Sequence, residues 1–424
     1  MIFSLDVRRA KKGDCLILHY GSKTDPGLGL IDGGPSQVYG PHLKPRLQEI
    51  RKMRKLGPDA PLPVDFLMVS HIDDDHINGV LELTKELLEA KAAKQQLPLK
   101  IKGVWHNTFD DIIGNSPKEL TAAVTAQFGT ASLSGEPDVD GLDPDVAKVL
   151  ASVDQGFRLR DDIRGLKLRV NPDFKGGLVI AKKKGKAIDM GKKLKFTVVG
   201  PLNDEVVDLQ KDHDAFLKKK KKAKKQGTAG TLAAFTDSSV ANLSSLVVLA
   251  EVGKKRMLLT GDARGDKVLE GLELVGLLKP DGESTMHVDV FKAPHHGSDR
   301  NADPVLFRRV TADHYVFSGN GEHGNPERAT LQMLFDERGD EDDYTIHLTY
   351  PIDEIDVGRK ADWEKEQKKE KARKKNNPNV KVRPTWAPKQ NSLTAFFAAH
   401  KKFAEKVVIV PEEEPHVINL LDEV

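Results

Sequence analysis

The sequence predicts an α/β protein built as an α+β sandwich, with two stacked sheets and helices on both outer faces. Short apolar runs of strand length alternate with amphipathic segments of helical period along much of the chain. Several of these runs end directly in Asp or His, as strands that lead into a functional edge do. The chain has 424 residues, which is enough for one large domain with additions.

The first half of the chain begins with strands and continues with alternating helices and turns. Residues 1–105 contain a helix over 45–56, a turn rich in His and Asp, and a second helix that ends near residue 95. Residues 110–195 carry helix-like stretches separated by Gly, Pro and Asp, which predicts a mainly helical insertion. Residues 201–230 are predicted to form a second, basic insertion.

The second half of the chain returns to strands. Strand signals resume over residues 195–199 and 246–252, and strands and helices then alternate to residue 350. We therefore predict one sandwich domain over residues 1–350 that contains both insertions. Residues 351–424 are expected to form an extension, with a charged linker or exposed helix first and a terminal helix with strands after it.

A turn at residues 70–79 carries the strongest functional signal in the chain. It directly follows the apolar run 66–69, and its ligand-type side chains are His71, Asp73, Asp75 and His76. At the end of a buried strand several of these groups can point at one spot, and imidazole with carboxylate suits a divalent cation. Capping of the following helix by Asp is the simpler alternative. Capping accounts for one Asp, however, and not for three flanked by His.

Three other apolar runs also end in polar groups. Asp262 follows one run, and a carboxylate at that position can bridge two ions. Asp32 follows another and is expected to orient a ligand from behind. A further run ends in His295 and His296, a pair that alone would often be solvated or hydrogen-bonded. Four such strand tips in one chain predict a shared metal centre.

Together these motifs resemble the metallo-β-lactamase superfamily, and most closely the branch that contains the hydrolase domain of the bacterial competence DNA-uptake channel. The resemblance covers roughly residues 1–350 and implies an αββα sandwich. The motifs that carry it are Gly13-Asp14-Cys15, Ile31-Asp32-Gly33-Gly34, His71-x-Asp73-x-Asp75-His76, Thr260-Gly261-Asp262 and Pro294-His295-His296-Gly297-Ser298.

The resemblance also implies a set of ligands for two divalent ions. His71 and Asp73 would hold one ion, and Asp262 would bridge to the second. The ligands implied for the second ion are Asp75, His76 and His295. The groups expected behind the ligands are Asp32, His296 and Ser298. Zinc is the usual ion of the superfamily, but Asp73 in place of an imidazole favours manganese or magnesium.

One ligand of the superfamily pattern is missing. Most members carry a further His between the first motif and the bridging acid, and residues 241–246 contain none. Either the first ion is bound weakly, or water and substrate complete its coordination. His106, after the apolar segment 101–105, is a candidate substitute, although a His at a strand end is more often structural.

The expected activity is hydrolysis of a phosphodiester in nucleic acid or a nucleotide signal. Two ions would make hydroxide available at neutral pH, with Asp75 holding the hydroxide-bearing ion. His323 matches a His-bearing loop of the branch and would contact a phosphate oxygen or the leaving group. Hydrolysis of a thioester, lactam or lactone is the alternative, because a fold does not decide the substrate. A metal-binding interaction module without catalysis is a second alternative.

Composition is that of an intracellular enzyme, and we expect a cytoplasmic location. Cys15 is the single cysteine, which excludes an internal disulfide, and no apolar run reaches the length of a membrane span. The formal net charge is only +2, from 66 basic and 64 acidic residues. The basic residues are clustered, however, most densely in the run Lys218, Lys219, Lys220, Lys221 and Lys222. This run is either a solvated face or a surface that contacts nucleic-acid phosphates.

The carboxyl-terminal tail contains a motif with two interpretations. Gln390, Leu393, Phe396 and Phe397 resemble the peptide by which partners dock on the sliding clamp of archaeal and eukaryotic replication. The same apolar residues also fit a terminal helix packed on the domain. We expect the folded tail, because burial within the same chain is the commoner fate of two adjacent aromatic rings.

Overall fold

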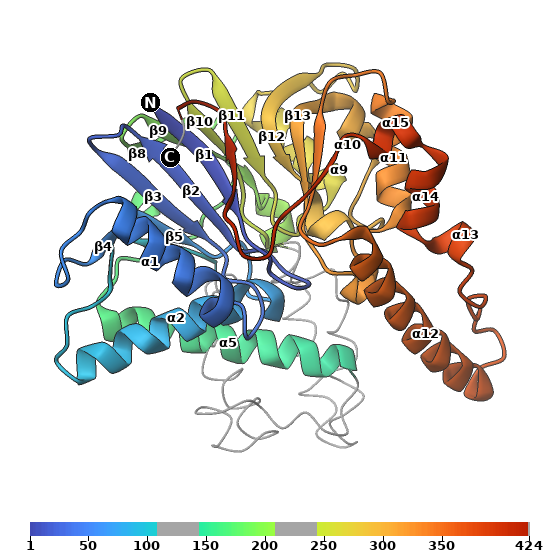
Figure 1. Cartoon of the computed structure of the whole chain (residues 1–424), viewed down its shortest axis with the longest axis horizontal. Coiled ribbons are helices and arrows are strands. Elements are labelled where there is room, and N and C mark those ends of the chain that lie inside the picture. The colour runs from blue at the N-terminus through green and yellow to red at the C-terminus, as the bar shows by residue number, and fades with distance from the viewer. Residues whose placement is uncertain (108–143, 208–243, 423–424) are drawn as a thin grey trace.

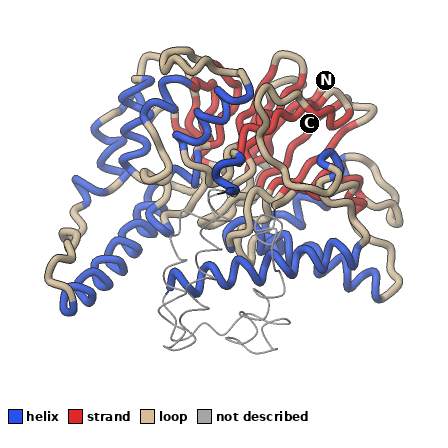
Figure 2. The backbone as a smooth tube through the Cα atoms, turned by 180° about the vertical axis from the view of Figure 1, so that it is seen from behind, coloured by secondary structure: helices blue, strands red, loops and turns tan. Residues whose placement is uncertain are grey.

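The computed structural model describes residues 1–107, 144–207 and 244–422. Two sheets lie face to face, and helices cover the outer side of each (Figures 1 and 2). The predicted α/β sandwich is therefore confirmed. Its strands read as apolar runs rather than as alternating patterns, because both faces of each sheet are covered.

The first sheet has six strands in the order β16-β1-β2-β3-β5-β7. Their bounds are β1 Ile2–Val7, β2 Leu16–Gly21, β3 Pro26–Ile31, β5 Phe66–Met68, β7 Val104–Trp105 and β16 His416–Asn419. Strands β3, β5 and β7 are parallel neighbours, whereas β16, β1, β2 and β3 pair antiparallel. The His-rich turn leaves this sheet at the end of β5.

The second sheet has eight strands in the order β15-β14-β13-β12-β11-β10-β9-β8. Their bounds are β8 Ile188–Gly191, β9 Leu194–Gly200, β10 Val247–Val252, β11 Lys255–Leu259, β12 Met286–Lys292, β13 Val310–Phe317, β14 Thr345–Leu348 and β15 Val407–Ile409. Strands β11 to β15 run parallel, so their carboxyl ends meet at one edge. Two short strands, β4 Leu62–Val64 and β6 Leu99–Ile101, pair separately.

Three apolar layers hold the sandwich together. The middle layer lies between the sheets and includes Phe3, Phe66 and Phe196. A second layer packs the first sheet against α1 Lys44–Met53, α2 Asp74–Ala92 and α5 Pro144–Leu166. A third packs the second sheet against helices from the later part of the chain, namely α9 Gly265–Val275, α10 Pro304–Arg309, α11 Arg328–Arg338, α12 Ile352–Asn376, α14 Leu393–Ala399 and α15 Lys401–Ala404.

Part of each predicted insertion falls within the described ranges. Helix α5 lies alongside α2, where Gln155 donates a hydrogen bond to Asn78 at 2.9 Å and Thr84 donates one to Asp162 at 2.6 Å. The start of the helical insertion, and the basic run Lys218 to Lys222, lie outside the described residues.

The carboxyl-terminal extension folds onto the body. Residues 352–376 form one helix, α12, and Leu393, Phe396 and Phe397 are buried in the third apolar layer. The structure thus has the folded tail rather than a free docking peptide, although Gln390 is exposed. Within the ranges above, no helix is long and apolar enough to cross a membrane.

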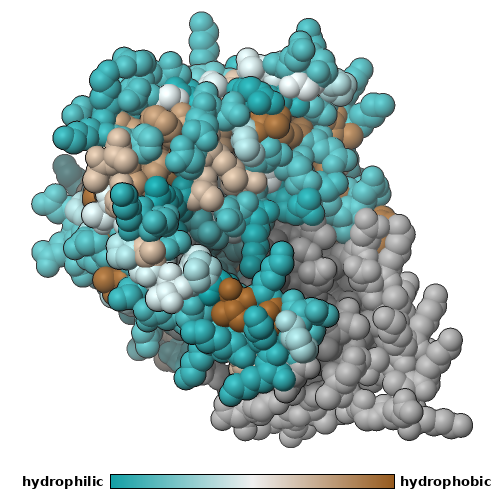
Figure 3. All heavy atoms as spheres, turned by 90° about the vertical axis from the view of Figure 1, so that its right-hand side faces the viewer, coloured by the Kyte–Doolittle hydropathy of each residue, from teal (hydrophilic) through white to brown (hydrophobic). Residues whose placement is uncertain are grey.

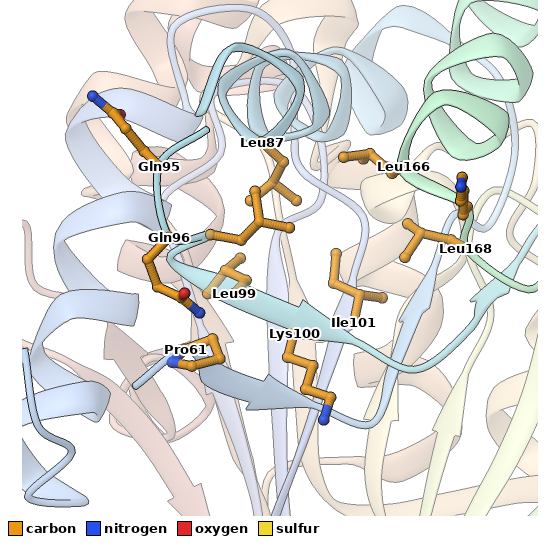
Figure 4. A pocket seen from close by; sticks show the side chains of 11 residues that line it. Pro61, Leu87, Gln95, Gln96, Leu99, Lys100, Ile101, Leu166 and Leu168 are labelled. Carbon is orange, nitrogen blue, oxygen red and sulfur yellow. The ribbon is translucent and has the colours of Figure 1, made fainter. Parts of the chain in front are cut away.

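A cavity of about 540 Å³ lies at the end of α2 that is remote from the His-rich turn (Figure 4). Its walls are mainly aliphatic, and include Leu87, Leu99, Ile101 and Leu166. Leu87, the residue of α2 that lines the cavity, lies 13 residues after Asp74, which is about 20 Å along the helix at 1.5 Å per residue. It offers no cluster of His or carboxylate side chains.

Candidate metal centre

The predicted strand tips meet at one edge of the sandwich. The first sheet brings His71 and His76 there, directly after β5 and in the first turn of α2. The second sheet brings Asp262 after β11 and His295 after β12. All of these strands end at this edge with their carboxyl termini, which is where α/β sheets place their functional groups.

The carboxylate of Asp262 is the middle of the centre, and it is surrounded by four imidazoles. Each of its oxygens faces two Nε2 atoms. On the Oδ1 side these are His76 at 3.1 Å and His296 at 3.3 Å. On the Oδ2 side they are His295 at 3.4 Å and His71 at 3.6 Å. One carboxylate therefore separates two pairs of imidazole nitrogens.

The other ring nitrogen of each histidine is held from outside the centre. The Nδ1 contacts are His76 to Asp32 at 2.8 Å, His295 to Asn301 at 2.8 Å, His296 to Ser318 at 2.8 Å and His71 to Ser70 at 3.2 Å. The hydroxyl of Ser318 donates to Asp14, and that of Ser70 donates to Asp32. Both hydroxyls must therefore accept from the imidazoles, so the network assigns the proton to Nδ1 and turns Nε2 toward Asp262.

Burial and charge act against each other in this cluster. Burial opposes ionisation of Asp262, but the four imidazoles outweigh it and hold the pKa of that carboxyl well below its usual value. Burial likewise opposes protonation of His296, yet Asp262 and Asp14 raise its pKa to about 9. Burial, and then the adjacent His76, lower the pKa of His71. In the absence of a cation, protons on the imidazoles balance the carboxylates.

These residues fit a divalent cation. The Nε2 atom of His71 is buried and has no hydrogen-bond partner within the described residues, although it points at two carboxylates. The Nε2 atoms of His76 and His296 lie only 3.2 Å apart. A bound cation replaces the imidazole protons and satisfies such nitrogens together. Imidazole nitrogen and carboxylate oxygen are also the donors that zinc and manganese accept.

The described residues contain two groups of candidate metal ligands, and within each group the ligand atoms all lie within 4.8 Å of one another. One group is Asp14, His76, Asp262 and His296, and the other is His71, Asp75 and His76. Asp73 is also near, with Oδ2 3.9 Å from His71 Nε2. His296 was expected behind the ligands, but it faces Asp262 as directly as His295 does.

Asp14 enters the centre from the loop between β1 and β2. A Cβ atom on Gly13 would lie 1.7 Å from the carbonyl oxygen of Asp75, so only glycine lets this loop approach α2. The buried ammonium of Lys292 lies 2.9 Å from Asp14 and, more than the nearby imidazoles, offsets the cost of burying that carboxylate. Asp14 lies in one of the motifs that carry the resemblance, but neither its role nor that of Lys292 was predicted from the sequence.

The remaining predicted residues lie around the centre or apart from it. Ser298 is buried and its backbone N–H donates to the carbonyl of His295. His106 is buried after β7 and belongs to neither group of mutually close ligand atoms. His323 is exposed in the turn Glu322–Gly324. Its neighbour Asn325 donates a hydrogen bond to the carbonyl of His295 at 3.2 Å, which ties this turn to the centre.

Comparison with known proteins adds little to this geometry. No protein-family model matches the chain. Microtubule-associated protein 1A of Rattus norvegicus and that of Mus musculus are each 44% identical over 52 residues, which are 12% of this chain and 2% of theirs. The chain thus spans a very small part of these curated relatives.

A Parabacteroides distasonis protein named "Putative metal-dependent hydrolase" is 8% identical, with 81% of this chain and 97% of that chain covered and a TM-score of 0.30. A TM-score of this size does not establish a shared fold. The case for a metal centre therefore rests on the residues around Asp262.

Proposed function

We propose that the protein is a metal-dependent hydrolase that cleaves phosphodiester bonds in nucleic acid or in a nucleotide signal. The observation that carries this proposal is the arrangement of four imidazole Nε2 atoms around the single carboxylate of Asp262. Two imidazoles at each oxygen suit a carboxylate that bridges two ions. A purely structural site would need neither the bridge nor a partly open side.

We assign the ligands by the oxygen of Asp262 that each imidazole faces. His71 and His295 lie on the Oδ2 side, and His76 and His296 lie on the Oδ1 side. The carboxylates that complete the set are Asp14, Asp73 and Asp75. When bound, two divalent ions supply Lewis acidity and a water whose pKa lies near neutrality. The ion is zinc by the resemblance, whereas so many carboxylates favour manganese or magnesium.

The side chains differ in how far a substrate can reach them. The side chain of His295 is 23% exposed and that of Asp75 is 11% exposed, whereas those of His71, His76 and His296 are at most 1% exposed. The substrate therefore approaches from the side of His295 and Asp75. We assign Asp75, as the ligand on this exposed side, to orient the attacking water. His323, on the exposed turn tied to His295, is assigned to the leaving group.

The choice of phosphodiester rests on the hardness of the centre and on the resemblance to the nuclease-containing branch. Because four carboxylates stand beside the four imidazoles, the centre also suits manganese or magnesium, ions that pair with phosphate oxygens in many hydrolases. Thioester, lactam or lactone hydrolysis would use the same centre with a different surface around it. The experiment must therefore compare substrate classes as well as metals.

The test uses the purified full-length chain with zinc, manganese or magnesium. The substrates are a small chromogenic phosphodiester, single-stranded DNA, RNA, a cyclic dinucleotide and a thioester. We expect metal-dependent turnover of a phosphodiester, loss of that turnover in Asp262→Asn, and normal turnover in the nearby Asp266→Asn, whose side chain is 47% exposed. Turnover of the thioester alone would assign the alternative activity. Tight metal binding without turnover of any substrate would assign an interaction module.

A further inference from the structure

A helical arm projects from the body of the protein at the lower right of Figure 1. We define the arm as α12 and the returning segment 377–387. The returning segment is fixed along the helix, because Arg383 pairs with Glu370 at 2.8 Å and Trp363 Nε1 donates to the carbonyl of Pro384 at 2.8 Å. The rings of Trp363 and Trp386 also pack edge to face, 5.8 Å apart. The arm is thus a built element and not a loose linker.

The outer part of the arm is strongly basic. Residues 365–375 contain seven Lys or Arg and two Glu, which gives a formal charge of 7 − 2 = +5. Glu366 pairs with Lys369 and Glu370 pairs with Arg383. At the tip, the side chains of Arg373, Lys374 and Lys375 are exposed, and they form no ion pair with any described residue.

Helix stability explains only a small part of this charge. Basic side chains in the last turn interact favourably with the helix dipole, by roughly 0.3–1 kcal/mol each. That benefit falls off within one turn, whereas the net-positive segment of α12 begins at Lys365, ten residues before Lys375. The first turn of the same helix is acidic, with Asp353 and Glu354. Positive charge is therefore concentrated on the half of the helix that leaves the body.

The base of the arm is joined to the rim of the metal centre. Arg359 donates a hydrogen bond to the carbonyl of Gly324 at 3.0 Å, in the turn that carries His323. A Cβ on Gly321 would lie 2.1 Å from the carbonyl oxygen of Ile355, so the backbones of turn and helix are in direct contact. From that turn, Asn325 reaches the carbonyl of His295. The arm thus begins beside the most exposed imidazole of the centre.

The arm has the dimensions of a short stretch of nucleic acid. From Arg359 to Lys375 the helix rises about 24 Å, at 1.5 Å per residue. One strand of a duplex presents about seven phosphates over that length, at 3.4 Å each. Figure 3 shows the face on which α12 projects, where hydrophilic side chains cover most of the described surface below a group of apolar patches. A phosphate backbone matches this charge and this length.

We propose that the arm binds the phosphate backbone of a nucleic acid whose scissile phosphodiester lies at the metal centre. This inference rests on the proposed function and narrows it from phosphodiesters in general to a polymer. The tip residues contact the polymer several phosphates away from the cleaved bond. They therefore govern affinity for a long substrate and not turnover of a small one.

The test compares two triple variants. The arm variant carries Arg373→Gln, Lys374→Gln and Lys375→Gln. The matched control carries Lys52→Gln, Lys94→Gln and Lys100→Gln, at exposed positions in α1, just after α2 and in β6, elements that lie away from the arm in Figure 1. Gln is nearly as good a helix former as Lys, so α12 is retained. The probe is a single-stranded phosphorothioate oligonucleotide, which keeps the charge and resists cleavage. Its affinity for the metal-loaded protein is measured over a series of salt concentrations.

We expect the arm variant to flatten the log–log salt dependence by about 2, from three lost contacts at about 0.7 each, and to lower affinity roughly 100-fold at 0.1 M salt. The control should change neither value, and both variants should hydrolyse the small phosphodiester like the wild type. Equal binding by the two variants would overturn the proposal. Polyglutamate, an acidic polypeptide, is tested as a second probe. If the arm variant lost binding to polyglutamate but kept binding to the oligonucleotide, the proposal would also be overturned, and the arm would be assigned to an acidic polypeptide instead. Failure of the wild type to hydrolyse any phosphodiester would refute the proposed function separately.

Discussion

His295 and His296 are adjacent in the sequence, yet their Nε2 atoms face opposite oxygens of the Asp262 carboxylate. Consecutive side chains on a strand point to opposite faces, so ordinary backbone would not bring both rings to one group. Here both residues have positive φ angles, 46° and 56°. Such left-handed geometry costs about 1–3 kcal/mol per residue and persists at functional sites that hold it in place. The pair is thus bent into the centre at an energetic cost.

Removing the bridging charge should remove metal. Asp262→Asn leaves the imidazoles without the carboxylate that both pairs face, so we expect bound metal to fall from two ions per chain to one or none, as measured by elemental analysis after gel filtration. Ions bound at 100 times their dissociation constant stabilise the native state by about 2.7 kcal/mol each, so the melting temperature should fall too. Full metal content in this variant would contradict the bridging role.

Asp75 and Asp74 form a matched pair for testing catalysis. Asp75 faces His296 at 3.8 Å, whereas the Asp74 side chain is 42% exposed and lies 3.3 Å from Lys12. We expect Asp75→Asn to lower kcat for a phosphodiester by orders of magnitude with little change in binding, because its role is in the chemical step. Asp74→Asn should retain most of the activity. Equal kcat values for the two variants would rule out the assignment of Asp75.

Asn301 should act on metal affinity without being a ligand. It accepts from His295 Nδ1 at 2.8 Å and donates to the carbonyl of Asp262 at 3.0 Å. Removal of such an outer hydrogen bond typically costs 10-fold to about 100-fold in metal affinity, so we expect a loss of that order in Asn301→Leu, measured by competition with a chelating dye. Asn301→Asp still accepts from the imidazole and should recover most of the affinity. The same affinity in all three proteins would show that His295 needs no support.

The folded tail should contribute to stability. Phe396 is 0% exposed and Phe397 is 4% exposed, so truncation of both leaves a cavity. We expect the double variant Phe396→Ala, Phe397→Ala to lose several kcal/mol in the free energy of unfolding, at roughly 3–5 kcal/mol for a buried Phe. Val357→Ala, at a position that is 72% exposed, is the control and should be nearly neutral. Unchanged chemical denaturation of the double variant would mean that the tail is not part of the core.

A row of three histidines should make the protein sensitive to acid. His347 contacts His314 at 3.0 Å and His416 at 2.8 Å, and burial followed by these neighbouring rings lowers the pKa of His347 to about 3. An unfolded chain protonates His near pH 6.5, so below that pH the unfolded state binds more protons than the native state. The stability contributed by neutral His347 is complete above pH 6.5 and decreases as the pH falls toward 3, by up to about 1.4 kcal/mol per pH unit.

Urea denaturation at several pH values measures this effect. The free energy of unfolding of His347→Gln should vary less with pH between 6.5 and 4 than that of the wild type. His287→Gln, whose side chain is 51% exposed, should follow the wild type. Identical pH slopes for wild type and His347→Gln would assign the acid sensitivity to other groups.

The strand tips could be predicted from the sequence because an apolar run is followed there directly by Asp or His. The apolar run before His71 and the one before Asp262 have the length and flanking residues of buried strands, which predicts that the polar groups after them gather where the strands end. Residue type does not reveal the sign of φ at a histidine, so the sequence could not show that His296 turns toward Asp262. The entry of Asp14 depends on a close contact between the β1–β2 loop and α2, which no local pattern encodes.

Long-range pairing was equally hidden from the sequence. Strand β16 completes the first sheet beside β1, with Ser4 opposite Asn419. The sequence of neither strand identifies the strand with which it pairs, because antiparallel pairing needs only compatible faces and edges. The apolar content of the tail predicted that it folds, but not onto which sheet.

The centre draws its groups from both halves of the sandwich, with His71 and His76 from the first sheet and Asp262, His295 and His296 from the second. Neither sheet alone can present two imidazoles to each oxygen of a shared carboxylate, so opening of the sandwich at this edge would release any ions bound there. Metal occupancy would therefore make the two sheets one cooperative unfolding unit, and its loss would let them exchange amide hydrogens independently. The centre would then cross-link the two sheets in addition to any role in catalysis.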